Sequence, residues 1–416
     1  MCNIQEKIFT LFQRNGKFII GVTLQGGIVL LKASVGYSTL DNAVNAGKEI
    51  ATNALSGLKA GTIGFLFTSV DYNQEKVLSG IRAVTKNMPI IGCTSSKAII
   101  VPDGIINSEN GFGGMLVIDD PDLEVGVACL SKDKDLREVG RKATLEALKN
   151  ANKDYAPNYY MMISNIEDEE EYIKGIQDVI GDIPMFGGSA ADNTIEGKWN
   201  ILSKDKVINN GVAIALFYTS KPIETIFTSE YEETDNVGVI SKVVGKHILS
   251  EIDGDPAIDK YVEWTDKKES DLKGNKLLRE SVLRPFGVKD VLGDITLIRH
   301  PLFGNDDGTV KVSNQIIKNT AIIGMSISVD NLIKSTGTTI EKVKAKLNSP
   351  GAYILMHSVG RKIAIADRLD EVHTNLVKAS NGVPFIMPLT FSEYGYSNHS
   401  GSRCGSLMLS FTGFEK

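Results

Sequence analysis

The chain is poor in cysteine, and the cysteines that it has are far apart. Its 416 residues include four, at Cys2, Cys93, Cys129 and Cys404, and no two of them form a C-x-x-C pair. This spacing argues against a structural zinc site and against a disulfide framework. Sparse, unpaired thiols are typical of a reducing cytoplasm, which is the location that we expect.

The sequence also lacks long apolar runs and clusters of one charge. No stretch approaches the ~20 apolar residues that a membrane-spanning helix needs. The first residues, MCNIQEKIFTLFQRNGKFII, have an early acidic residue and no uninterrupted apolar core, so they do not resemble a signal peptide. The net charge is −6 and the two signs are well mixed, which argues against nucleic-acid binding.

The usual metal and nucleotide motifs are missing as well. The five histidines form no H-x-x-x-H or H-E-x-x-H arrangement, and no Walker loop or G-x-G-x-x-G follows a predicted strand. We therefore expect no metal and no cofactor. Haem stays open as an alternative, because an axial ligand needs only one histidine. His357, at the end of a predicted buried strand, is the candidate, and a histidine packed in the core or at its rim is the ordinary interpretation.

What the sequence does contain is an internal repeat. Residues 75–96, EKVLSGIRAVTKNMPIIGCTSS, match residues 170–191, EEYIKGIQDVIGDIPMFGGSAA, without a gap and 95 positions apart. The match extends back to FLFTS, which ends at Ser69, and YMMIS, which ends at Ser164. Each copy predicts a strand, an amphipathic helix and a second strand that ends in a small polar loop.

The repeat also predicts where a ligand binds. The strands of a βαβ unit are parallel, so their carboxyl ends lie at the same edge of the sheet, where open α/β sheets usually bind ligands. The loops 92–96 and 187–193 offer backbone N–H groups and hydroxyls that can hold a carboxylate or phosphate. A single loop of this kind is explained equally well as a tight turn that packs strand against helix. Two matched loops at one edge of the sheet favour a ligand-binding site.

A weaker third copy lies near the C-terminus. The strand AYILMHS ends at Ser358, residues 371–380 predict a helix, and Pro384 follows Pro184 by 200 positions. In this copy the N–H donors of the Arg361 guanidinium can bind an anionic group of a ligand, and the Glu393 carboxylate can accept hydrogen bonds from an amino group. A structural Arg–Glu pair is an equally good interpretation of these two residues.

Length and composition predict two domains in a soluble protein. Hydrophobic residues make up 42% and charged residues 23%. We expect an extension over residues 1–33, with a helix in IQEKIFTLFQ and a hairpin that turns at Gln25-Gly26-Gly27. We also expect one domain over 34–225 and another over 235–416, with a polar stretch as the boundary between them. The predicted fold class is α/β (mixed α+β), with two domains built from repeated strand–helix–strand units and mixed sheets.

These segments together resemble the FIST family, a sensory module of FIST N and FIST C domains. The resemblance rests on VGYSTLDNAVNAGKEIATNAL, MPIIGCTSS and IPMFGGSAADN in the first half, and on LRPFGVKD, HSVGRKIAIADRLDEV and FSEYGY in the second. The sequence departs from the family pattern at Lys97, Ala98, Ser358 and Ser392. If the family pocket uses those positions, this protein binds a different ligand or none.

The resemblance implies a cytoplasmic, non-enzymatic sensor of a small ligand, an amino acid or small carboxylate. Its output is expected to be a separate partner, such as a histidine kinase or a cyclic-dinucleotide enzyme. A haem-based nitric oxide sensor is one alternative. A hydrolase or transferase that uses Cys93 or Ser358 is a second, although no histidine near Cys93 in the sequence lowers its pKa. The candidate ligand-binding residues are Ser69, Gly92, Cys93, Thr94, Ser95, Ser164, Gly187, Gly188, Ser189, Asp192, Asn193, Ser358, Arg361 and Glu393.

Overall fold

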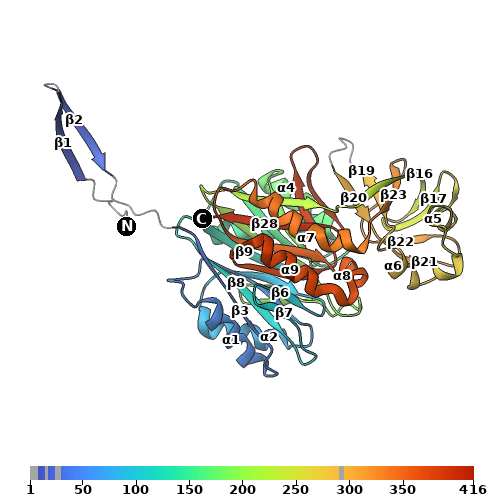
Figure 1. Cartoon of the computed structure of the whole chain (residues 1–416), viewed down its shortest axis with the longest axis horizontal. Helices are drawn as coiled ribbons and strands as arrows, with labels where there is room; N and C mark the ends of the chain where they lie inside the picture. Colours follow the sequence, from blue (N-terminus) through green and yellow to red (C-terminus); the bar gives the residue numbers. More distant parts are fainter. Residues whose placement is uncertain (1–7, 15–16, 24–29, 290–294) are drawn as a thin grey trace. The chain divides into compact units, whose positions relative to one another are not determined.

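A computed structural model describes residues 8–14, 17–23, 30–289 and 295–416 (Figure 1). The chain forms two compact units, Met1–Leu30 and Leu31–Lys416. In the first unit, β1 (Ile8–Arg14) pairs with β2 (Lys17–Thr23) as an antiparallel hairpin. The helix that we predict in IQEKIFTLFQ is therefore wrong where it is described, since its β-branched and aromatic residues favour a strand.

The hairpin that we predict between KFIIGVTL and GIVLLKAS is also wrong. The first of these runs pairs with β1, and the second leads into a strand of the second unit, β3 (Lys32–Ser38), which pairs with β8. The predicted turn at Gln25-Gly26-Gly27 lies outside the described residues.

In the second unit, three six-stranded sheets share one strand order. A parallel pair stands at the centre of each sheet. Two antiparallel strands extend it on one side, and a hairpin extends it on the other. In sheet order, the strands of the first are β13 (Lys206–Ile208), β12 (Ile201–Ser203), β5 (Ile90–Thr94), β4 (Ile63–Thr68), β8 (Gly113–Asp119) and β3.

The second and third sheets repeat this arrangement. The strands of the second are β27 (Gly401–Gly405), β26 (Glu393–Ser397), β11 (Met185–Ser189), β10 (Tyr159–Ser164), β14 (Gly211–Tyr218) and β9 (Glu124–Ser131). The strands of the third, from the other edge, are β7 (Gly104–Ile106), β6 (Ile99–Val101), β25 (Phe385–Thr390), β24 (Pro350–Ser358), β28 (Leu409–Glu415) and β15 (Ile223–Thr228).

Each sheet is completed by the hairpin of another copy. The β6–β7 hairpin, which follows β5 of the first copy, pairs with β25 of the third. The β12–β13 hairpin, which follows β11, pairs with β5 of the first copy. The β26–β27 hairpin, which follows β25, pairs with β11 of the second copy. The three copies are therefore interlocked in a closed cycle.

A pair of helices covers each sheet on its outer face. Side-chain caps at Asn42, Asn73, Asp135 and Ser328 begin four of these helices by accepting a backbone N–H, as cap residues do. The pairs are α1 (Ala43–Ala54) with α2 (Gln74–Thr85), α3 (Leu136–Ala151) with α4 (Glu169–Ile180), and α7 (Val329–Lys344) with α9 (Leu369–Ser380). The third copy adds α8 (Val359–Ile365) and a 3₁₀ turn, Ala366–Arg368.

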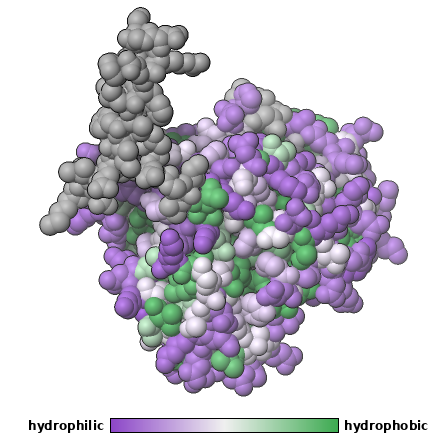
Figure 2. Space-filling model, turned by 60° about the vertical axis from the view of Figure 1, so that its left-hand side comes forward, coloured by the Kyte–Doolittle hydropathy of each residue, from purple (hydrophilic) through white to green (hydrophobic). Residues whose placement is uncertain are grey.

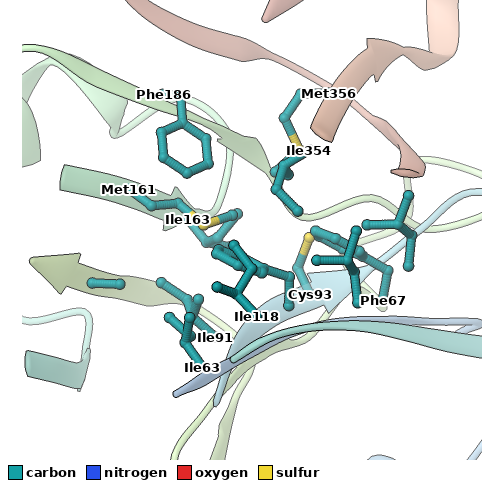
Figure 3. Close-up of a cluster of buried hydrophobic side chains, with 14 of the residues drawn as sticks. Ile63, Phe67, Ile91, Cys93, Ile118, Met161, Ile163, Phe186, Ile354 and Met356 are labelled. Carbon is teal, nitrogen blue, oxygen red and sulfur yellow. The ribbon is translucent and has the colours of Figure 1, made fainter. Parts of the chain in front are cut away.

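The inner faces of the three sheets meet in one apolar core (Figure 3). Phe67 and Cys93 come from the first sheet, Met161 and Phe186 from the second, and Met356 from the third, and all five are fully buried. Because helices cover the other face of each sheet, β4 and β10 are buried on both faces and are apolar along nearly their whole length. The surface in Figure 2 is mostly hydrophilic, with smaller groups of apolar residues between.

The segment between β15 and α7 is an insertion that forms its own sheet (Figure 1). It also holds helices α5 (Ala257–Thr265) and α6 (Lys276–Glu280) and the 3₁₀ turn Glu269–Asp271. Its strands, in sheet order, are β20 (Thr296–Arg299), β19 (Phe286–Lys289), β23 (Ala321–Ser326), β16 (Glu232–Val244), β17 (Ile248–Ile252), β22 (Val310–Val312) and β21 (Pro301–Gly304), with β18 (Asp255–Pro256) beside β17.

The mixed α/β class is confirmed, and the strand register corrects one detail of the repeat. In the parallel pairs, Thr68 lies opposite Thr94 and Ser164 lies opposite Ser189. Ser164 therefore corresponds to Thr68 rather than to Ser69, because the loop between strand and helix is one residue shorter in the second copy. The polar stretch that we predict as a domain boundary contains the end of β15 and the start of β16.

Candidate ligand site at the strand ends

Three backbone hydrogen bonds join the carboxyl ends of β5, β11 and β25. The Ala191 amide donates to the Thr94 carbonyl at 3.0 Å, the Phe391 amide to the Ser189 carbonyl at 3.3 Å, and the Ser96 amide to the Leu389 carbonyl at 3.1 Å. Each bond runs from one copy to another, so the three form a closed ring. The loops that follow the three strands are thereby held together.

A chamber of about 860 Å³ lies beside this ring. The strand-end loops of the first two copies contribute Ser96, Lys97, Asp192 and Asn193 to its wall. Val359 and Lys362 come from α8, and the insertion contributes Arg279 and Phe303 among other residues. The chamber is therefore built from all three copies and the insertion.

A smaller inner pocket of about 60 Å³ adjoins the chamber. Its other walls include Glu169, His300, Ser358 and Ser392. The two spaces share six wall residues, all of them apolar: Ile195, Leu278, Leu302, Val359, Ile363 and Phe391. Together they form one site with a wide outer part and a narrow inner end.

Three basic side chains of the chamber form no ion pair in the part of the chain that the structure describes. These are Lys97, Arg279 and Lys362, whereas Lys311 is paired with Glu167 at 2.6 Å. Burial, and then the charge of Lys97, lowers the pKa of Lys362, and Asp367 opposes this effect. The two lysines are thus close enough to repel each other.

The acidic residues of the chamber are already engaged. The Asp192 carboxylate is 1% exposed and accepts the backbone N–H groups of Thr194, Ile195, Glu196 and Lys198. Glu196 is paired with Lys198 at 2.7 Å. Asp192 therefore shapes the loop, and the electrostatic character of the chamber is set by its free cations.

Three of the predicted site residues line these cavities. Asp192 and Asn193 lie in the chamber wall, and Ser358 borders the inner pocket. Asn193 also joins two loops, because its Oδ1 accepts the Lys97 amide at 2.9 Å and its Nδ2 donates to Asp71 at 3.3 Å. The Ser358 hydroxyl accepts the Leu407 amide at 3.2 Å. None of the other predicted residues contributes to either cavity wall.

The predicted glycines bring backbones together. A Cβ on Gly92 would lie 1.6 Å from the Leu66 carbonyl oxygen, and one on Gly187 would lie 1.9 Å from that of Met162. A Cβ on Gly188 would lie 2.9 Å from the Ser392 carbonyl oxygen. Only glycine permits such close approach, so these positions serve strand packing.

The predicted hydroxyl residues of the first copy bond within the protein. Ser69 donates to Asp71 at 2.5 Å. Ser95 donates to the Ala98 carbonyl at 2.6 Å and accepts the Leu389 amide at 2.8 Å. Thr94 accepts the Asn200 amide at 2.9 Å. These bonds fix the loops in place.

In the second copy the hydroxyls form a buried network. The Tyr394 hydroxyl lies 2.8 Å from Ser164 Oγ and 2.5 Å from Ser189 Oγ. Ser189 donates to Glu169 Oε1 at 3.0 Å. The network joins β10, β11 and β26 to the first residue of α4, and its Glu169 reaches the inner pocket.

Arg361 and Glu393 are both fully buried, and no ion pair joins them. Arg361 donates to the carbonyls of Ser229, Leu407 and Leu332 and to the Ser335 hydroxyl. Glu393 accepts from the Thr390 hydroxyl at 2.9 Å and the Met408 amide at 3.0 Å, and burial raises its pKa. Arg361 therefore holds α7, α8 and nearby loops together rather than facing the chamber.

Cys93 and His357 lie away from both cavities. Cys93 is in the central apolar core (Figure 3), and burial raises the pKa of its thiol. His357 is fully buried, its ring nitrogens have no hydrogen-bond partner, and burial followed by the charge of Arg361 lowers its pKa to about 3. This geometry does not suit an axial haem ligand. In the described part of the chain, no group of three His, Cys, Asp or Glu side chains is placed to hold a metal ion.

The sequence alone does not single out the basic residues of the chamber as ligand-binding residues. Lys97 stands out only as a departure from the family pattern, although the repeat aligns it with Asp192 of the second copy. Lys362 follows Ser358 by one helical turn, which the third copy also allows one to find. Arg279 and His300 come from the insertion, which has no counterpart in the repeat and gives no comparable signal.

Family models match most of the chain. The FIST N domain matches residues 62–255, and the FIST C domain matches residues 257–396. The chain belongs to the FIST family. FIST N and FIST C domains are sensory domains that bind small ligands. In the described part of this FIST protein, no helix is both long and apolar enough to cross a membrane.

Comparison with solved structures gives distant likenesses to the FIST protein. A cyanuric acid hydrolase from A. caulinodans is 7% identical, with a TM-score of 0.38 over 93% of this chain and 100% of that one. Phosphoribosylformylglycinamidine synthase II from Thermotoga maritima is 9% identical, with a TM-score of 0.23 over 92% of this chain and 72% of that one. No curated protein sequence matches the chain.

Proposed function

We propose that this FIST protein is a non-enzymatic sensor whose ligand is a small carboxylate, such as an amino acid, bound in the chamber. The observation that carries the proposal is that Lys97, Arg279 and Lys362 line one cavity without an acidic partner among the described residues. Ammonium and guanidinium groups bind carboxylates through short, charge-assisted hydrogen bonds. A bound anion also relieves the repulsion between the two lysines.

The dimensions of the site support a small ligand. A volume of about 860 Å³ lies within the range of pockets that enclose metabolite-sized molecules. Six shared apolar residues lead from the basic chamber to the inner pocket. A ligand with an anionic end and an uncharged body therefore matches the order of polar and apolar walls.

The hydrolase or transferase alternative has less support. Cys93 is packed among apolar side chains with a raised pKa, whereas a nucleophilic thiol needs a lowered one. His357, the residue before Ser358, is buried and engages no hydroxyl, so it does not activate Ser358 as a base. The cytoplasmic location and a separate signalling partner stay predictions.

Thermal unfolding in the presence of ligands tests the proposal. A ligand that binds the native state raises the melting temperature with its concentration. We expect shifts with amino acids or small carboxylates, no shift with their methyl esters, and a reduced shift in Lys97→Ala and Lys362→Ala. Lys149→Ala, an exposed residue near the end of α3, is the matched control. Equal shifts with acids and esters would contradict an anion site.

A further inference from the structure

Glu169 is a buried residue that borders the inner pocket, and one oxygen of its carboxyl group has no hydrogen-bond partner. Its side chain is fully buried, Oε1 accepts from Ser189 at 3.0 Å, and Oε2 has no hydrogen-bond partner. Leaving such an atom unpaired in the interior costs roughly 1–3 kcal/mol. An unpaired oxygen beside a cavity points to a group that binds there.

The internal repeat supplies a natural comparison for Glu169. Gln74 and Leu369 occupy the same position as the first residues of α2 and α9. The Gln74 amide is fully bonded, since Oε1 accepts from Thr68 at 2.6 Å and Nε2 donates to the carbonyls of Ser69 and Tyr72. The fold therefore accepts an amide or an alkyl group at this position, and the carboxyl of Glu169 is not needed to start the helix.

His300 supplies a second polar group to the same pocket. Its Nε2 lies 2.8 Å from the Leu278 carbonyl, so Nε2 carries the proton and Nδ1 is left as an acceptor. Nδ1 has no hydrogen bond among the described residues. Burial lowers the pKa of His300 to about 4, which keeps the ring neutral.

The surroundings of Glu169 favour the neutral form of its carboxyl group. Burial, followed by the charge of Glu170, raises its pKa to about 8. With Oε1 accepting from Ser189, the proton belongs on Oε2. In the protonated form, Glu169 offers an O–H donor to the inner pocket and His300 offers a nitrogen acceptor, in a wall that also contains Glu167 and four serines.

We propose that the inner pocket recognises a carboxamide, whose carbonyl accepts from Glu169 and whose N–H donates to His300. The inference rests on the proposed function, because the anionic end of the same ligand occupies the chamber. A volume of about 60 Å³ holds a few heavy atoms, about the space of two waters in the liquid, and so fits a terminal group of this size. A carboxylate is disfavoured there because it brings a charge into an apolar pocket and cannot donate to His300.

The probes are amic acids, which carry a carboxylate at one end and a carboxamide at the other. Succinamic, glutaramic and adipamic acids are compared with the matched diacids and with straight-chain monocarboxylic acids by calorimetry and thermal unfolding. We expect an amic acid to bind at least ~10-fold more tightly than its matched diacid or monocarboxylic acid. Equal affinity across the three classes would overturn the inference and leave the chamber site intact.

Two variants of Glu169 separate recognition from folding. Glu169→Gln keeps a donor at the pocket and copies the first repeat, so it retains the preference for amic acids. Glu169→Leu copies the third repeat and removes the donor, so the preference is lost while monocarboxylic acids still bind. An unchanged preference in Glu169→Leu would sink the inference. If no acid binds at all, the proposed function fails, and butanamide alone then tests the inner pocket. A rise in melting temperature with butanamide that Glu169→Leu abolishes supports the inference. No rise in melting temperature with butanamide refutes it.

Discussion

Lys97 and Lys362 line the same chamber, and the charge of Lys97 contributes to lowering the pKa of Lys362. Lys97 also sits at a φ of 63°, in the left-handed region that side chains other than glycine rarely occupy. Like charges and an unusual backbone conformation at one place are typical of a site where stability is sacrificed for binding.

Neutralising Lys97 should therefore separate stability from binding. In Lys97→Gln we expect unchanged or slightly higher stability, by less than ~1 kcal/mol because the side chain is exposed, together with weaker carboxylate binding. Urea unfolding and calorimetry measure the two quantities. A variant that loses stability and keeps full affinity would show that the lysine is structural.

Removing Arg361 should destabilise the protein without acting on the ligand directly. Its guanidinium is fully buried and bonds three carbonyls and one hydroxyl. Each buried acceptor left without its donor costs about 1–3 kcal/mol. We expect a loss of stability in urea unfolding of Arg361→Met, with ligand affinity unchanged at low temperature, where the variant is still folded. A variant that keeps its stability but no longer binds the ligand would show that Arg361 contacts the ligand directly.

The pH dependence of stability should change when Glu169 is replaced. A carboxyl whose pKa rises from about 4.3 in the unfolded chain to about 8 in the native state binds more protons when folded, so its contribution to stability falls as pH rises through that window. The groups that act electrostatically on Glu169 or are acted on by it, namely Glu170, Asp168, Glu393, Tyr394 and Cys404, are not altered by this replacement.

Glu169→Gln removes only this contribution. Its stability relative to the unmodified protein should increase with pH between about 4.5 and 8, by up to roughly 1 kcal/mol per unit. Urea unfolding at several pH values gives the curve. A difference that is flat over this range would mean that Glu169 is ionised in the native state.

The thiols of the second unit should be inert in the native protein. Cys93, Cys129 and Cys404 are buried, and burial raises the pKa of each. In a Cys2→Ser background, a thiol reagent at neutral pH should label none of them until the protein is unfolded in urea. Rapid labelling of Cys93 in native protein would revive the thiol-dependent enzyme.

Local patterns predicted the repeated units well, because each unit is encoded by contiguous residues. The alignment of the first two copies located β5 and β11 with their glycines, and Pro384 marked the third copy before β25. Ser69 was paired with Ser164 one position out of register, because a loop that differs by one residue leaves no trace in an ungapped alignment.

The site itself depends on contacts that the sequence does not display. Lys97 and Arg279 meet in one chamber only because a long insertion folds back over the strand ends. The role of Glu169 follows from its burial and from a neighbouring histidine 131 positions away. No local pattern distinguishes this carboxylate from the other acidic residues that begin α4.

The exchanged hairpins have a consequence for synthesis on the ribosome. The hairpin that begins at Ile99 finds its partner strand only when residues near Met387 have left the exit tunnel. Until then a newly made chain has an unpaired edge, which is a hazard for association with other nascent chains. The second sheet likewise waits for residues after Glu393. The first hairpin therefore stays without its partner strand while the chain between Ile99 and Met387 is made.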